Sequence, residues 1–317
     1  MICVFDIETV PDIELVRQYY ELDSTLSQIE VCQYAFNAQK EKSGSEFLPI
    51  YWHRVVSIAS VICDEYGRFI KVGNFGKKSS SQTTHNETST SLDSPSTKSP
   101  QSSTEESKTQ SNTKASAKSS TDSSAFTHLA DERAILSDFL RFINSKEPRL
   151  VSFNGRGFDL PAIMLRAMRY NLSAFGYFES ENASKTKNKW ENYRARYSEK
   201  WHTDLLECLG NFGSVRNLNL DNVCKMLGIV GKYEVSGGDV YSLYYDKKDI
   251  EKIDFYCQSD VLNTYWLYLK YAILKDELRL EDYAGILEDF KEKLPKDREY
   301  SQAFVANINK ELERIGQ

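Results

Sequence analysis

The stretch Ile2-Cys-Val-Phe-Asp-Ile-Glu8 decides the fold. Its first four residues are an apolar run, which predicts a buried strand that opens the domain. Alternate side chains of a strand lie on the same face, so Asp6 and Glu8 are expected to point the same way. Two carboxylates at the end of a buried strand are costly unless positive charge neutralises them. Either a divalent metal ion binds the pair, or both acids face water at the strand end.

Further strands and helices follow along the chain. Strands are expected at residues 2–5, 54–63, 68–75 and 149–153, the second and third forming a hairpin around Gly67. Helices are expected at residues 131–145, from Pro161 onward, and at 218–227, 248–274, 277–292 and 298–315. An irregular connection is expected at residues 173–201, and a short apolar segment is expected at 203–209. Strands followed by strand–helix alternation imply an α/β domain with a mixed central sheet flanked by helices.

Residues 79–125 differ sharply in composition from the rest of the chain. Of these 47 positions 26 are Ser or Thr, one is Leu and none is aromatic. Such a segment cannot bury enough apolar surface to offset its ordering entropy, so it is predicted to be a disordered insert. It is either a tolerated surface loop or a segment that binds a partner or is phosphorylated. Residues 1–317 are expected to form a single domain around it, with 276–317 as a C-terminal helical extension.

Charge and cysteine content exclude several classes of protein. The net charge of −6 argues against a protein that coats nucleic acid by bulk charge, but allows an enzyme that holds it through metal ions. Six Cys without a C-x-x-C pair, and only four His, argue against a structural zinc site and indicate reduced thiols. No signal peptide is evident, and no apolar run approaches the roughly 20 residues of a membrane span. A cytoplasmic location without a membrane partner is expected.

Two more acidic elements accompany the first. The segment Val151-Ser-Phe-Asn-Gly-Arg-Gly-Phe-Asp159 runs from an apolar strand through a loop to an Asp that either caps the next helix or faces a cleft. In Tyr256-Cys-Gln-Ser-Asp260 the Tyr and the Asp lie one turn apart on a largely apolar helix face. Asp260 therefore needs a partner, which is either a metal ion shared with the first strand or solvent at the domain rim.

Taken together and in this order, the three elements resemble the motifs of the DEDD 3′–5′ exonucleases, in the DEDDy subgroup with Tyr in the third motif. More narrowly, the chain resembles predicted exonucleases related to the proofreading domain of family B DNA polymerases. The supporting stretches are residues 5–12, 53–59, 152–161, 196–198 with 202–205, and 256–265. The resemblance covers most of residues 1–275 apart from the insert.

The resemblance implies a ribonuclease H-like fold and hydrolysis of phosphodiester bonds from the 3′ end of single-stranded nucleic acid, with DNA as the expected substrate. It implies two Mg²⁺ or Mn²⁺ ions, which stabilise the entering and leaving oxygens. It assigns the metal-site acids as Asp6, Glu8, Asp159 and Asp260. Tyr256 would position the attacking water, and Asn154 would be a supporting polar residue.

Three other residues have two interpretations each, and a fourth has one. Arg156 either reaches a substrate phosphate or is a solvated loop residue, and Phe158 either wedges against a terminal base or packs in the core. Lys232 either contacts phosphate or lies in an exposed turn. Asp204 is a candidate supporting group for the acidic cluster. We count Asn154, Arg156 and Phe158 as the expected substrate-binding set.

Two other functions are open. An exoribonuclease of the same superfamily would use the same four acids, and only a contact to the 2′-hydroxyl would distinguish it. A catalytically inactive nucleic-acid-binding or interaction module is the other alternative. A dense negative pocket argues against such a module, because it would repel the phosphates that the module must bind. The sequence names no protein partner.

Overall fold

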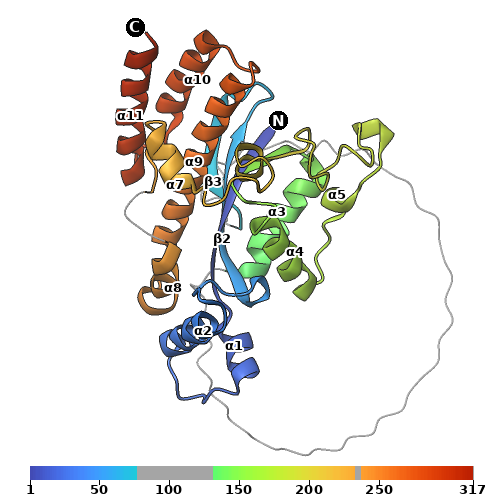
Figure 1. Cartoon of the computed structure of the whole chain (residues 1–317), viewed down its shortest axis with the longest axis vertical. Coiled ribbons are helices and arrows are strands. Elements are labelled where there is room, and N and C mark those ends of the chain that lie inside the picture. The colour runs from blue at the N-terminus through green and yellow to red at the C-terminus, as the bar shows by residue number, and fades with distance from the viewer. Residues whose placement is uncertain (77–130, 233–236, 317) are drawn as a thin grey trace, which may run out of the picture. The chain divides into compact units, whose positions relative to one another are not determined.

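The structure, a computed structural model, describes residues 1–76, 131–232 and 237–316. The predicted insert at 79–125 lies outside these residues, so its disorder stays a prediction. The described residues form a sheet with helices on both of its faces (Figure 1).

The sheet has five strands among the described residues, in the order β3-β2-β1-β4-β5. They are β1 (Ile2–Pro11), β2 (His53–Cys63), β3 (Phe69–Asn74), β4 (Arg149–Ser152) and β5 (His202–Asp204). The central strand β1 pairs antiparallel with β2 and parallel with β4, and β4 pairs parallel with β5. The expected α/β class with a mixed central sheet is confirmed.

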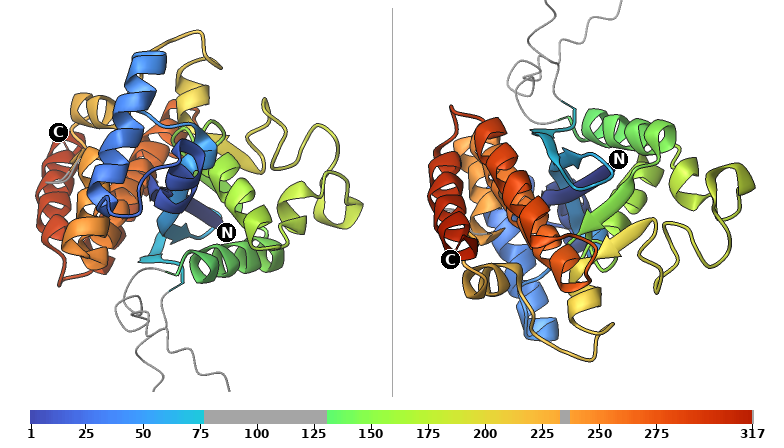
Figure 2. Two further views of the ribbon diagram at one scale, coloured as in Figure 1. Left: turned by 90° about the horizontal axis from the view of Figure 1, so that it is seen from below. Right: turned by 90° about the horizontal axis from the view of Figure 1, so that it is seen from above.

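Side chains of β1 alternate between two hydrophobic cores. Ile2 and Val4 belong to the core shared with α9 (Ile250–Leu274), α10 (Leu280–Lys293) and α11 (Glu299–Ile315). Cys3 and Phe5 belong to the core shared with α3 (Glu132–Lys146) and α4 (Asp159–Arg169). Figure 2 shows these two groups of helices on opposite sides of the sheet. The acids that continue the Ile2–Val4 row along β1 therefore lie on the face that α9 covers.

The long helices lie where the sequence predicts them, within two or three residues at each end. Helices α10 and α11 occupy the stretch expected to form the C-terminal extension, and their apolar side chains join the core of α9. The buried Trp266 of α9 donates a hydrogen bond to the Tyr283 hydroxyl of α10 at 2.8 Å. Among the described residues, no helix is both long enough and apolar enough to cross a membrane. All six cysteines are described, and all are free thiols.

Several elements were not predicted. Between β1 and β2 the chain forms α1 (Ile13–Tyr20), α2 (Gln28–Ser43) and a 3₁₀ turn at Ile50–Trp52. The short apolar segment at 203–209 contains the last residues of β5 followed by α6 (Leu205–Leu209), and α5 (Phe175–Phe178) lies within the irregular connection. Helix α7 (Leu220–Met226) was expected, whereas α8 (Val240–Ser242) and the π turn at Leu243–Lys247 were not. The strand β1 is also longer than its apolar run, because its acidic half pairs with β2 as far as Pro11.

Candidate active site

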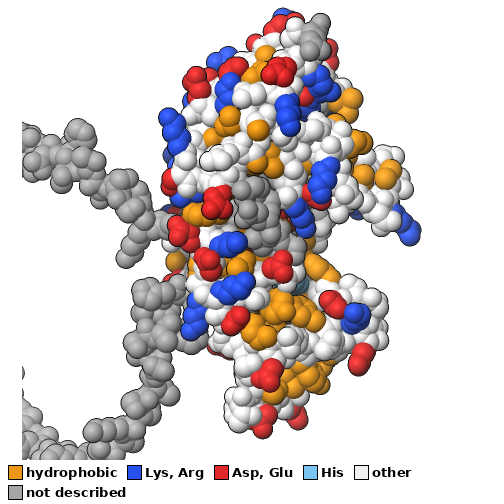
Figure 3. All heavy atoms as spheres, turned by 90° about the vertical axis from the view of Figure 1, so that its left-hand side faces the viewer, with side chains coloured by type: hydrophobic (Ala, Val, Ile, Leu, Met, Phe, Trp, Pro, Cys, Tyr) orange, Lys and Arg blue, Asp and Glu red, His pale blue; other side chains and the backbone are white. Residues whose placement is uncertain are grey.

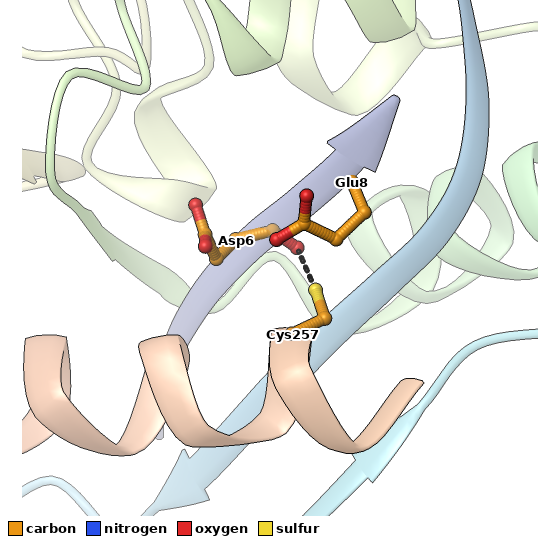
Figure 4. Close-up of side chains that lie close together, drawn as sticks. All are labelled: Asp6, Glu8 and Cys257. Carbon is orange, nitrogen blue, oxygen red and sulfur yellow. Dashed lines mark hydrogen bonds between the residues drawn. The ribbon is translucent and has the colours of Figure 1, made fainter. Parts of the chain in front are cut away.

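Asp6 and Glu8 lie together on the α9 side of β1, as their spacing predicts (Figure 4). One ligand atom from each carboxylate and the Cys257 sulfur all lie within 4.8 Å of one another. The Cys257 thiol donates a hydrogen bond to the Asp6 backbone carbonyl at 3.5 Å. Burial, with the neighbouring charges of Glu8 and Asp6, raises the pKa of this thiol well above its usual range. Cys257, which the sequence analysis did not single out, is therefore a protonated donor that fixes the helix against the strand.

Asp159 adds a third carboxyl group to the Asp6–Glu8 pair. It is the first residue of α4 and is 4% exposed. Its carboxyl group shares a hydrogen bond with the Asp6 carboxyl, which requires a proton on one of them. Burial raises the pKa of Asp159 to about 7, and burial together with the charge of Asp159 raises the pKa of Asp6. The two acids thus form a coupled pair that holds a proton far above the pH at which a free carboxyl loses it.

The loop from β4 to α4 is held in place by Asp204 at the end of β5. The Asp204 carboxylate accepts hydrogen bonds from the backbone N–H groups of Asn154 and Arg156, both at 2.9 Å. Gly155 lies so close to β4 that a Cβ atom there would be 2.3 Å from the Ser152 hydroxyl oxygen. These contacts fix the position at which α4 starts. Asp204 therefore supports the loop that carries Asp159, and its charge adds to the elevation of the Asp159 pKa.

Tyr256 and Asp260 project from one face of α9 toward the acids of β1. Both are buried, at 5% and 9% exposed. The Tyr256 hydroxyl donates a hydrogen bond to the Asp260 carboxylate. Burial, followed by the charge of Asp6, raises the pKa of Asp260 to about 7. Burial and the nearby Asp260 and Glu8 raise the pKa of Tyr256 as well, so this side chain is a neutral phenol and a hydrogen-bond donor.

Lys232 brings positive charge to the cluster. Its charge lowers the pKa values of Asp6, Glu8 and Asp260, opposing the larger effect of their burial. The preceding Gly231 has a left-handed backbone, with φ of +74°, and Asn263 of α9 binds both its N–H at 3.1 Å and its carbonyl at 2.7 Å. The glycine in Gly-Lys was the sequence signal for this turn. The two hydrogen bonds between Asn263 and Gly231, which hold this turn against α9, were not predicted.

Two cavities reach the acids. The larger, of about 590 Å³, reaches Glu8 and Lys232. Its aromatic lining comes from Phe36, Phe47, His53, Phe158 and Tyr241. The smaller, of about 300 Å³, reaches Asp260 and Lys232 and is bordered by Asn154, Leu206, Leu218 and Asn219. Figure 3 shows hydrophobic side chains gathered in the lower half of one face, at the height of α1 and α2 in Figure 1.

The three expected substrate-binding residues have different surroundings. Phe158 lines the larger cavity and packs edge-on against the rings of His53 and Phe47, at 5.0 and 5.3 Å. Asn154 is exposed, has a left-handed backbone with φ of 70°, and borders the smaller cavity. Arg156 donates to two backbone carbonyls, at 2.9 and 2.7 Å, and lies 3.3 Å from the Glu207 carboxylate. A phosphate contact by Arg156 stays a prediction, and these internal contacts make it the weakest of the three.

The donor set of this cluster fits a hard divalent cation. Carboxylate oxygens are the ligands that Mg²⁺ and Mn²⁺ prefer, and the neighbouring sulfur is a protonated thiol rather than a thiolate. Burial, together with the charges of neighbouring carboxylates, raises the pKa values of half-buried Asp6 and of buried Glu8, Asp159 and Asp260, so these acids are costly to ionise without such a charge. The structure therefore brings the four acids predicted from the sequence into one cluster, and their role as metal ligands stays a prediction.

Comparison with known proteins agrees with this arrangement. A DNA polymerase of Archaeoglobus fulgidus is 28% identical over 137 residues, which cover 43% of this chain and 17% of the polymerase. The chain thus matches less than a fifth of that relative's length. A family model described as a predicted 3′–5′ exonuclease related to the exonuclease domain of PolB matches residues 107–308, which include Asp159, Tyr256 and Asp260 but not β1. The expected ribonuclease H-like fold is confirmed, and the chain belongs to this family of predicted exonucleases related to PolB.

Proposed function

We propose that this protein is a 3′–5′ exonuclease that depends on divalent metal ions and acts on single-stranded ends, with DNA as the preferred substrate. The observation that carries the proposal is the convergence of four carboxyl groups from β1, α4 and α9, three of them buried and Asp6 half-buried, all with raised pKa values. Burying and crowding these groups makes their ionisation costly, and a structural role would not require that cost. Membership of the PolB-related exonuclease family supports the reaction class.

The four acids would hold two Mg²⁺ or Mn²⁺ ions, Asp6, Glu8, Asp159 and Asp260 serving as ligands. Such a pair of ions stabilises the entering and leaving oxygens and makes a water molecule more acidic. Tyr256 is a neutral donor one turn from Asp260, so its hydroxyl would orient the attacking water rather than remove a proton from it. Lys232 would balance part of the negative charge around the scissile phosphate.

The larger cavity would take the terminal nucleoside. Its volume of about 590 Å³ lies within the range of small-ligand sites, and aromatic rings including Phe158 line it beside Glu8. An unpaired base can leave its stack and enter such a pocket, whereas a paired base must first separate from its partner. This difference supports single-stranded ends as the substrate.

The two alternatives remain distinguishable. An exoribonuclease would use the same acids, and a contact to the 2′-hydroxyl would decide between the sugars. An inactive binding module would bind nucleic acid strongly without metal ions and with a steep dependence on salt. A cytoplasmic location stays a prediction.

The decisive experiment is digestion of 5′-labelled single-stranded DNA and RNA with Mg²⁺, with Mn²⁺ and with EDTA. We expect a ladder that shortens from the 3′ end, faster on DNA, and no products in EDTA. The variant Asp6→Asn should be inactive, whereas Glu65→Gln, which alters an exposed acid in the β2–β3 turn, should match the wild type. Products from internal cleavage, or activity that EDTA leaves unchanged, would contradict the proposal.

A further inference from the structure

Tyr197 and Phe212 form an aromatic pair at the surface. The rings of Tyr197 and Phe212 pack edge-to-face with centroids 4.8 Å apart and an interplanar angle of 67°. Tyr197 is 75% exposed, far more than an aromatic side chain that serves only a core. The two residues come from separate segments, the irregular connection before β5 and the loop between α6 and α7.

The loop that presents Phe212 has an unfavourable backbone. Phe212 has a φ of 53°, and its neighbours Asn211 and Gly213 have φ of 46° and 97°. A bulky side chain is rare in this left-handed region, and such residues persist where surrounding contacts enforce them, often at functional sites. Here the Phe212 N–H donates to the Glu207 carbonyl at 2.7 Å. The fold thus holds a ring against Tyr197 on the surface, in a conformation that a solvated loop would avoid.

Positive charge accompanies the pair. The Arg196 guanidinium lies over the Tyr197 ring, 5.9 Å from its centroid, and its side chain is 52% exposed. The nearby carboxylate of Glu207 is already paired with Arg196 and with Arg156. Arg216, on the same loop as Phe212, is exposed. An arginine over an aromatic face, with a second exposed arginine on the same loop, matches single-stranded nucleic acid, whose bases stack on rings while its phosphates attract cations.

The same loop leads into the candidate active site. Its last residues, Leu218 and Asn219, border the smaller cavity together with Asp260. Leu206, one residue before Glu207, borders it from α6. The loop that carries Phe212 therefore connects the aromatic pair to the edge of the smaller cavity.

We infer that Tyr197, Phe212, Arg196 and Arg216, here termed the aromatic rim, bind the single strand on the 5′ side of the nucleotide that is removed. This placement rests on the proposed function: if the larger cavity holds the terminal nucleoside, the next nucleotides leave the acids through the smaller one. A base stacks on the Tyr197–Phe212 pair, and the two arginines contact phosphates.

The test is a binding titration with a 5′-fluorescein-labelled oligo(dT) 20-mer. Fluorescence anisotropy measures the binding, and EDTA in the buffer prevents cleavage. Tyr197→Ala and Phe212→Gly should each weaken binding by roughly 5- to 100-fold, the range expected for one stacked base. Phe212→Gly also removes the unfavourable backbone, so this variant should fold at least as well as the wild type. Tyr197→Phe, which keeps the ring, should bind nearly normally. Arg216→Ala should make the negative slope of log K against log salt less steep by about 0.7, the value for one phosphate of a single strand.

Tyr66→Ala is the matched control, since Tyr66 is 72% exposed in the β2–β3 turn. Equal binding by Tyr197→Ala and wild type, or an equal loss in Tyr66→Ala, would overturn the inference. Kinetic measurements distinguish a failure of this inference from a failure of the proposed function. In Tyr197→Ala the KM for the 20-mer should rise, while hydrolysis of the p-nitrophenyl ester of thymidine 5′-monophosphate, too small to reach the aromatic rim, should not change. A wild type that binds through the rim but never hydrolyses DNA or RNA would refute the exonuclease alone, and normal hydrolysis with an unchanged KM would refute the rim alone.

Discussion

The Cys257 thiol and the Asp6 backbone carbonyl are joined by a hydrogen bond of 3.5 Å, although 251 positions separate them in the chain. The contact sets the register of α9 against β1. One turn before Cys257, the Asp254 carboxylate accepts a hydrogen bond of 2.6 Å from Ser57 of β2, which reinforces the same register. Because of this docking, Tyr256 and Asp260 face the acidic half of β1 rather than its apolar half.

Asp6→Ala and Asp260→Ala should each abolish hydrolysis without unfolding the protein. Removing one acid relieves repulsion in the metal-free state, so the free energy of unfolding should stay level or rise. For Asp260, whose pKa is raised from 3.8 to about 7, the gain at pH 8 is at most about 4 kcal/mol. Thermal melts in EDTA and in Mn²⁺ test this, because the stabilisation by Mn²⁺ should shrink in both variants. Turnover at the wild-type rate would remove both residues from the site.

The metal-free protein should lose stability from its acidic cluster as the pH rises from about 4 to above 7. Asp159 and Asp260 have pKa values raised to about 7 when folded, so in this window the folded state binds more protons than the unfolded state. The cost is absent below the unfolded pKa and complete above the folded one. Urea melts across this range isolate the effect by comparison with Asp260→Asn, which should show a shallower fall.

The same raised pKa values predict that metal binding releases protons near pH 6.5. A divalent ion needs ionised ligands, and the coupled acids still hold protons at that pH. Calorimetric titration with Mn²⁺ in two buffers of different ionisation enthalpy measures the release directly. Identical apparent enthalpies in both buffers would show that the acids are already ionised, contrary to this expectation.

The local parts of the site could be predicted because they follow from chain periodicity. The period of two placed Asp6 and Glu8 on one face, and the helical period placed Tyr256 beside Asp260. The contacts between distant segments could not be predicted. The hydrogen bond of Cys257 to Asp6 and those between Asn263 and Gly231 depend on how α9 packs against the rest of the fold. Arg156 illustrates the limit, because a loop between two glycines suggested a free side chain and the fold instead turned it toward internal carbonyls.

The missed helices α1 and α2 have a similar explanation. Ser27 and Glu30 form a capping box, which is a sequence signal for the start of α2 that was not used. The apolar side chains of both helices are few. Val16 and Val31 are buried in a small cluster with Trp52, whereas Cys32 of α2 is buried in another cluster that includes Tyr244. Neither helix shows the long apolar stripe that made α9 predictable.

Arg166→Ala should destabilise the protein by about 3–5 kcal/mol, the usual cost of breaking a buried ion pair. Arg166 of α4 is 4% exposed and binds two carboxylates, Glu132 of α3 and Asp12 after β1, each at 2.7 Å or less. Its loss leaves both acids buried and releases the helix that begins with Asp159. Chemical denaturation measures the change, and catalysis should fall with it.

Arg141→Ala is the control for that substitution. Arg141 also pairs with an acid on α3, but its side chain is 73% exposed, so the pair should contribute no more than about 1 kcal/mol. An equal loss of stability in the two variants would mean that burial does not determine the cost.

Deleting residues 80–124 should leave activity on short oligonucleotides near that of the wild type. The described residues before and after this segment are in contact, because the Gly76 N–H donates a hydrogen bond to the Asp138 carboxylate at 3.0 Å. All residues of the candidate site lie elsewhere. Single-turnover cleavage of a 10-mer measures the effect. A folded deletion variant with most of its activity lost would show that the segment contributes to the reaction.

Tyr256→Phe should lower kcat by on the order of 10²-fold while changing metal affinity little. Burial and then the neighbouring charges raise the pKa of Tyr256, so it stays protonated and cannot act as a general base at neutral pH. What Phe removes is the hydroxyl that donates to Asp260 and would orient the attacking water, and loss of such a group costs about 10²–10⁴-fold. The low end is expected because all four acids stay in place. Single-turnover hydrolysis and a Mn²⁺ titration of the same variant measure the two quantities.

Tyr265→Phe is the matched control, since it removes a buried hydroxyl that lies on the same helix more than one turn beyond Asp260 and donates to the Gly67 carbonyl at 2.8 Å. It should cost about 1 kcal/mol of stability and leave kcat unchanged. If Tyr256→Phe behaves in the same way, Tyr256 only packs. If instead it loses metal affinity, the hydroxyl serves to hold Asp260 in position, and the water must be oriented by another group.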